Sequence, residues 1–176
     1  MQAIRIVCLS VLAAIAYGIV HDQVTARICV EYFTIGHPPI FGTDDPTLLG
    51  IGWGVVATWW VGLILGLGLA FAARVGPRPK RDAGSLVKPI SRLLCVMAAC
   101  AIAASLVGYL AARAGVVHLL GWLATEVPAD RQTAFLADAW AHSASYLVGF
   151  IGGVIVCVSV WRSRRRSLAR PVVEAP

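Results

Sequence analysis

Long apolar stretches joined by polar connections dominate the hydrophobic pattern of this chain. A helix needs about 20 mostly apolar residues to cross a bilayer, and four stretches come near that length: 4–20, 48–73, 90–112 and 143–161. The pattern therefore predicts an all-α fold, an integral membrane four-helix bundle. We expect a single transmembrane domain over residues 1–170 and a disordered tail at 171–176.

The first stretch also resembles a cleavable secretory signal. Arg5 precedes the apolar run, and Ala14-Ile15-Ala16 has the small residues typical of a cleavage site. The apolar run continues past that site to Val20, which favours a retained span. We therefore expect four spans, with cleavage of the first as the alternative.

Two helices are predicted to extend above the bilayer on the same side. Residues 27–33 can continue the first helix, and the helical spacing of apolar residues at 135–140 places the start of the fourth near Ala129. Asp45 before Pro46 is typical of a helix start, with the acid as N-cap and the proline at the first helical position.

Small residues recur at a spacing that lets membrane helices approach closely. Gly62 and Gly66 lie four residues apart in the second span, and Gly149 and Gly153 do so in the fourth. These pairs favour a compact bundle, and self-association is their less favoured use.

Composition supports a membrane protein and charge predicts its orientation. The chain is 59% hydrophobic and 14% charged, whereas soluble domains are roughly 45–50% apolar and about 25% charged. Of its 15 basic residues, 12 are predicted to lie on one side of the membrane: Arg5, those at or beside the connection between spans two and three, and those of the C-terminal segment. Only Arg27, Arg113 and Arg131 are predicted to lie on the opposite side. Because cytoplasmic loops carry the excess of Lys and Arg, we expect both termini in the cytoplasm. We expect the basic segments to lie against anionic lipid headgroups, and we expect no nucleic-acid partner.

Candidate chemistry gathers on the predicted outer side, where all four histidines fall. Counting at 1.5 Å per residue places His21 and Asp22 roughly 24–26 Å above Arg5, and His142 roughly 30 Å above Arg162. Different helices therefore deliver ionisable groups to one narrow layer near the outer edge of the bilayer.

A metal site is the leading interpretation of this layer. Asp138 and His142 are four residues apart and share a helical face, so both can bind one ion, or Asp138 can fix the tautomer of His142. With His21 and Asp22 they form the predicted ligand set, suited to zinc or iron. Glu31 is the candidate catalytic residue, a general base acting through water.

Other polar residues of the layer keep alternatives open. Arg113, His118 and His37 form a further candidate polar site, with Arg113 as an anion-binding or charge-pairing group. In the simpler alternative, these groups are solvated at the membrane interface and Asp138 pairs with Arg131 or Arg113.

Two segments carry a resemblance to known proteins. The text of residues 31–39, EYFTIGHPP, followed by GWGVVATWW at 52–60, resembles an uncharacterised group of bacterial multi-pass inner-membrane proteins. The resemblance covers most of the chain and implies a bacterial inner-membrane location, but it implies no activity.

Three functional hypotheses follow. The first is an outward-facing metal or ligand site that supports hydrolysis of a lipid-borne or periplasmic substrate. The second is a non-enzymatic accessory or scaffold subunit, in which the faces around Gly62 and Gly149 bind a larger membrane protein or a second copy. The third is a small oligomeric transporter or channel. Whether the protein is an enzyme stays open, because the sequence contains no phosphate-binding loop, no nucleophile elbow and no haem-attachment motif.

Overall fold

The computed structural model describes residues 1–166, and all the secondary structure of these residues is helical. The helices are α1 (Gln2–Ile28), α2 (Glu31–Thr34), α3 (Pro46–Val56), α4 (Trp59–Arg74), α5 (Gly84–Arg113), α6 (Trp122–Glu126) and α7 (Gln132–Arg166). The predicted tail, 171–176, lies outside the described residues.

Four segments are long and apolar enough to cross a membrane, namely Gln2–Ile28, Pro46–Arg74, Gly84–Arg113 and Gln132–Arg164. Large apolar side chains such as Leu12, Ile64 and Ile102 are exposed on their outer faces, where lipid would cover them. The all-α four-helix bundle is confirmed, and the length and composition of its helices identify a multi-pass membrane protein.

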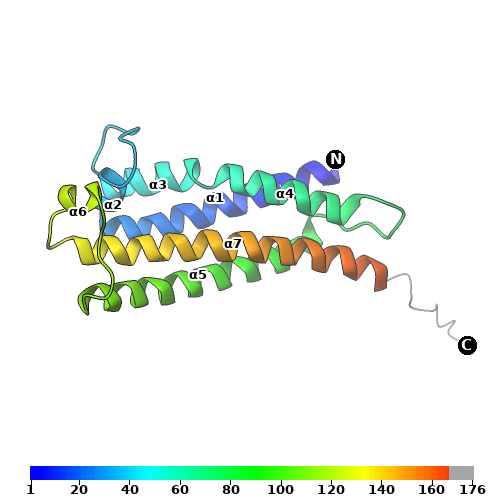
Figure 1. Cartoon of the computed structure of the whole chain (residues 1–176). Helices are drawn as coiled ribbons and strands as arrows, with labels where there is room; N and C mark the ends of the chain where they lie inside the picture. Colours follow the sequence, from blue (N-terminus) through cyan, green and yellow to red (C-terminus); the bar gives the residue numbers. More distant parts are fainter. Residues whose placement is uncertain (167–176) are drawn as a thin grey trace, which may run out of the picture.

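The helices form two closely packed pairs (Figure 1). α1 lies along α3 and α4, α5 lies along α7, and contacts between α4 and α7 join the pairs, whereas α1 touches α5 and α7 at few places. The N-terminus, the connection at 75–83 and the C-terminal part of α7 share one end of the bundle, which we call the basic end. The opposite end, with α2, α6 and the start of α7, is called the histidine end.

Helix boundaries differ from the sequence expectation near Cys29. The first helix stops at Ile28, because the backbone at Cys29 is extended (φ −149°, ψ 95°), and Glu31–Thr34 forms the separate helix α2. This turn brings the buried Phe33 back over the bundle, where a continued helix would leave it in solvent. The N-cap prediction is confirmed, since the Asp45 carboxylate accepts a hydrogen bond of 2.8 Å from the amide of Leu48.

The second span is two helices, with a break at Ala57 and Thr58 between α3 and α4. A broken helix at membrane depth needs other donors for its carbonyl groups. The Thr58 hydroxyl donates to the carbonyl of Gly54, and the Tyr146 hydroxyl donates to that of Ala57 over 3.3 Å. Side chains therefore satisfy the backbone at the break.

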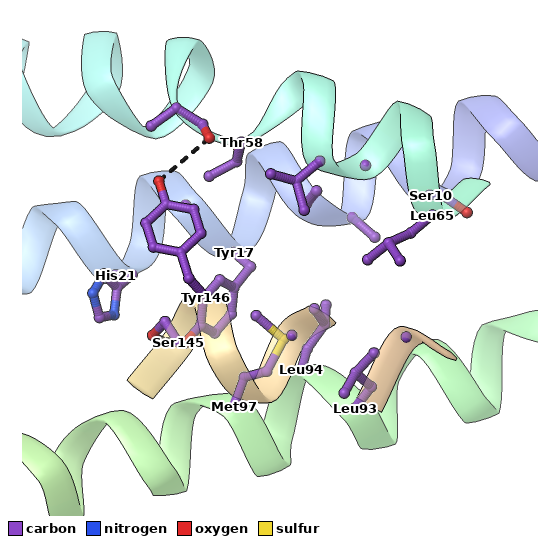
Figure 2. A pocket seen from close by; sticks show the side chains of 18 of the residues that line it. Ser10, Tyr17, His21, Thr58, Leu65, Leu93, Leu94, Met97, Ser145 and Tyr146 are labelled. Carbon is purple, nitrogen blue, oxygen red and sulfur yellow. Dashed lines mark hydrogen bonds between the residues drawn. The ribbon is translucent and has the colours of Figure 1, made fainter. Parts of the chain in front are cut away.

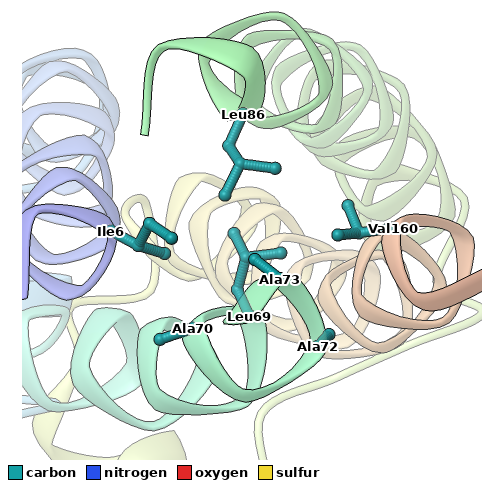
Figure 3. Close-up of a cluster of buried hydrophobic side chains, with 7 residues drawn as sticks. All are labelled: Ile6, Leu69, Ala70, Ala72, Ala73, Leu86 and Val160. Atoms are coloured by element: carbon teal, nitrogen blue, oxygen red, sulfur yellow. The ribbon is translucent and has the colours of Figure 1, made fainter. Parts of the chain in front are cut away.

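Glycines set the distance between the helices. Val11 and Ala14 of α1 lie against Gly62, and Met97 lies against Gly149, so the chain's own helices cover both glycines. At the basic end the core is a cluster of seven buried side chains (Figure 3), namely Ile6, Leu69, Ala70, Ala72, Ala73, Leu86 and Val160.

Replacing Gly54 by alanine is expected to destabilise the bundle by about 1–3 kcal/mol, the usual cost of overpacking. A Cβ at Gly54 would lie 2.5 Å from the Cα of Ile19, and that backbone cannot rotate away. Gly68→Ala is the matched control, because its Cβ would meet only the Cys157 sulfur at 3.6 Å. Thermal unfolding in mild detergent measures both. Equal unfolding temperatures would show that the α1–α3 contact is looser than described.

Candidate functional site

Three potential metal ligands meet inside the histidine end. His21 and Asp22 come from α1 and His142 from α7, and one donor atom of each lies within 4.8 Å of the other two. Asp22 and His142 are only 5% and 9% exposed. The structure thus brings together three of the four residues predicted from the sequence as a ligand set.

The tautomer of His142 follows from its hydrogen bonds. Its Nδ1 lies 2.8 Å from the backbone carbonyl oxygen of Asp138. A carbonyl only accepts hydrogen bonds, so Nδ1 carries the proton and Nε2 of the neutral ring presents a lone pair. That Nε2 lies 3.2 Å from Oδ1 of Asp22. Two acceptors face each other at this distance, and a proton or a metal cation between them makes the contact favourable.

The distance between the donor atoms of His142 and Asp22 suits a metal ion. Ligands bound at 2.0–2.1 Å to a tetrahedral ion lie roughly 3.3 Å apart, close to the 3.2 Å between His142 and Asp22. The third residue, His21, has a buried Nε2 with no hydrogen-bond partner among the described residues. An imidazole nitrogen that is buried and unpartnered beside a carboxylate is suited to becoming a ligand.

Aromatic side chains surround the three donors. The ring of His21 meets that of His142 edge-on at 4.5 Å and stacks on Tyr17 at 5.7 Å between centroids. From α2, Tyr32 stacks on His142 at 4.4 Å, and Phe33 contacts the same ring edge-on at 5.8 Å. These rings hold both histidines in place and shield the cluster from solvent.

Glu31 anchors α2 and lies outside the three-donor cluster. Its Oε1 accepts from Nε of Arg131 at 3.0 Å, and its Oε2 accepts from the Cys29 thiol at 3.3 Å. Burial by itself would raise the pKa of Glu31, but hydrogen bonds from the backbone, Cys29 and Arg131 outweigh it and the pKa is lowered. Burial raises the pKa of the Cys29 thiol to about 12, so it stays protonated at neutral pH. Glu31 therefore ties α2 to the start of α7, and its catalytic role stays a prediction.

Asp138 contributes its backbone to the site. It is the backbone carbonyl, and not the carboxyl group, that accepts the hydrogen bond from His142 and fixes its tautomer. The carboxyl group is fully buried, and neither of its oxygens has a hydrogen-bond partner in the described part of the chain. The alternative pairing with Arg131 is not what the structure shows, because Arg131 pairs with Glu31.

The remaining predicted residues separate into two groups. His37 lies beside the cluster, where its Nδ1 is 2.8 Å from the Tyr32 carbonyl oxygen and its ring lies 4.6 Å from that of Trp53. Burial lowers the pKa of His37. Arg113 and His118 are exposed and take no part in the three-donor cluster.

An internal cavity of about 140 Å³ opens from the cluster and runs between the helix pairs (Figure 2). His21, Asp22 and His142 all line it. Tyr17 and Ser145, whose hydroxyl oxygens lie 2.8 Å apart, stand next to the histidines in its wall. Sequence reasoning missed these hydroxyl groups, because single Tyr and Ser residues in apolar spans carry no distinguishing spacing.

Comparison with known proteins adds no relative. No protein-family model, no curated protein and no solved structure matches this chain.

Proposed function

We propose that this membrane protein binds a transition metal ion, zinc or iron, through His21, Asp22 and His142. The observation that supports this most is the contact between His142 Nε2 and Asp22 Oδ1, two acceptors 3.2 Å apart once Nδ1 donates to a carbonyl. The unpartnered Nε2 of His21 supplies a third donor. Imidazole and carboxylate are the ligands that these metals share.

The ligand number points to a reactive site rather than a structural one. Structural zinc sites use four protein ligands, whereas catalytic sites use three and leave a position for water or substrate. Such an ion would supply Lewis-acid activation of a water molecule or a substrate oxygen. His142 would bind through Nε2 while Asp138 orients its ring, and the three donors line the cavity from which a substrate would approach. Hydrolysis of a lipid-borne substrate is the reaction that we propose.

We also propose that the bundle lies in a bacterial inner membrane with its basic end in the cytoplasm. Twelve of the 15 basic residues support this orientation under the positive-inside rule. The resemblance carried by residues 31–39 and 52–60 supports the bacterial origin. The metal site would then face outward.

An accessory or scaffold role receives no specific support from the described residues. That hypothesis assigns the faces around Gly62 and Gly149 to a partner, whereas in the structure Val11, Ala14 and Met97 cover these two glycines. Binding to a larger membrane protein or a second copy stays a prediction.

Elemental analysis of the detergent-purified protein tests the metal site. We expect near-stoichiometric zinc or iron in the wild type and background levels in His142→Ala. His118→Ala is the matched control, because His118 is an exposed histidine at the same end, and its metal content should equal that of the wild type. A folded wild type without metal after growth in supplemented medium would contradict the proposal. His142 and Asp22 would then be a buried ion pair that joins α1 to α7.

A further inference from the structure

The internal cavity has room because the residues between the helix pairs are small. α1 touches α5 and α7 at few places, so space remains between these helices. Glycine and alanine form much of the wall, namely Ala13, Ala14, Gly18, Gly62, Gly149 and Gly153. At Gly149 and Gly153 a Cβ would meet the side chains of Met97 and Leu65, which also line the cavity, so these two glycines leave room in it.

The imidazole and carboxyl groups that line this cavity lie at one end, whereas Ser10 at the other end donates its hydroxyl hydrogen to the carbonyl of Ile6. The three metal donors, His37 and the hydroxyl groups of Tyr17 and Ser145 lie toward the histidine end. The other end is walled by Leu69, Ile90 and Val156, which belong to or pack against the buried cluster at the basic end. A polar solute that filled this space would leave its own polar groups unpaired beside Leu69, Ile90 and Val156, which is unfavourable.

The shape of the cavity selects among apolar ligands. It extends along α1 from His21 to Ser10, roughly 16 Å at 1.5 Å per residue. The space open to atom centres in it is about 140 Å³, which over that length makes it a narrow channel. A two-tailed phospholipid or a fused-ring sterol is too wide for such a channel, whereas one extended hydrocarbon chain matches its form.

We propose that the cavity holds a single-chain lipid, with its polar end against His21, Asp22 and His142 and its tail directed toward the basic end. The inference rests on the proposed metal site for what the polar end meets, and it names the class of product that this site would leave in the cavity, because hydrolysis of a lipid ester adds water and releases a fatty acid or an alcohol. The surrounding bilayer supplies such molecules, as fatty acids or as isoprenoid alcohols. Both share the chemistry that the cavity requires, a flexible apolar tail and one oxygen-bearing end.

Photo-crosslinking of the full-length protein in detergent tests this inference. The probes are palmitate and geranylgeraniol, each with a diazirine in its tail, and unlabelled lipid serves as competitor. We expect competable crosslinks to the lining segments at 93–97 in α5 and 149–157 in α7. The probe that labels at the lower concentration identifies the fatty-acid or the isoprenoid source.

A pair of matched variants locates the binding site. Ala13→Leu fills the channel from α1 and should lower crosslinking by roughly tenfold or more. Ala16→Leu makes the same change on the exposed face of the same helix and should leave crosslinking unchanged. If Ala13→Leu fails to fold, competition and the position of the crosslinks in the wild type still decide the question.

The result that overturns the inference is labelling confined to outward-facing residues such as Ile102 and Leu106, or labelling that unlabelled lipid does not reduce. Metal content is measured on the same samples. If the wild-type protein contains metal but its cavity is not labelled, the lipid-binding inference is rejected and the proposed metal site stands. If the cavity is labelled but the protein contains no metal, the proposed function is rejected, together with the contact between the lipid's polar end and a metal ion. The position of the lipid tail in the cavity would still stand.

Discussion

Replacing Asp22 by asparagine is expected to weaken zinc binding by roughly a hundredfold or more. Loss of a mere supporting residue around a metal ligand costs about 10–100-fold in affinity, and Asp22 supplies the only carboxylate of the three-donor cluster. Asparagine keeps the size and the acceptor oxygen of the side chain, so the contact with His142 and the packing are retained. The loss therefore reports the missing negative charge. Competition between the purified protein and a chelating dye measures the affinity.

Asp130→Asn is the control for this experiment. Asp130 is an exposed acid at the same end of the bundle, so its replacement removes the same charge without touching the cluster. Its zinc affinity should equal that of the wild type. If Asp22→Asn retained full affinity while His142→Ala lost it, the charge of Asp22 would play no part in metal binding and Asp22 would have to be removed from the ligand set.

Replacing Arg164 by methionine is expected to destabilise the protein by about 3 kcal/mol or more. Arg164 is fully buried at the basic end. Its Nε donates to the carbonyl of Pro79 at 2.8 Å, and its two terminal nitrogens donate to those of Ala72, Val75 and Arg78. Hydrogen bonds to a charged group contribute about 1.5–3 kcal/mol each, and methionine would leave these four carbonyls, of which that of Ala72 is buried, without that donor.

Thermal unfolding in detergent measures this loss, with two companion variants. Arg162→Met changes an exposed arginine two residues earlier and should leave the unfolding temperature close to that of the wild type. Arg164→Lys keeps the charge but lacks the planar fork of donors, so it should fall between the wild type and Arg164→Met. A lysine variant as stable as the wild type would show that charge alone stabilises the connection at 75–83.

The sequence was sufficient for the four spans, since their apolar stretches are long and the helix start at Asp45 has its own local signature. It was insufficient for the helix ends. The turn at Cys29 depends on tertiary packing, because Phe33 of α2 becomes buried only when the chain folds back. The break at Ala57 likewise depends on Tyr146, which is 89 residues away. Neither cause is visible in a local pattern.

The candidate site was predictable in membership but not in the roles of its residues. Counting along the helices placed His21, Asp22 and His142 in one layer, and the structure brings them together. The four-residue spacing of Asp138 and His142 did reflect a contact, but the backbone carbonyl makes it. Arg164 was one of many basic residues that suggested orientation, and only the folded chain shows which carbonyls surround it. Spacing gives proximity along a helix, whereas the direction of each side chain depends on its neighbours from other helices.

The division of the donors between the first and the last span has a consequence for biosynthesis. His21 and Asp22 are translated before His142, which follows roughly 120 residues later. During insertion, α1 must therefore enter the membrane with a buried acid and an imidazole that have no partner until α7 arrives. A chain that stops before α7 would lack the third ligand and the backbone carbonyl that orients it. Under the proposed function, metal loading would then wait for the insertion of α7, so a bound ion would mark chains in which α1 and α7 have met.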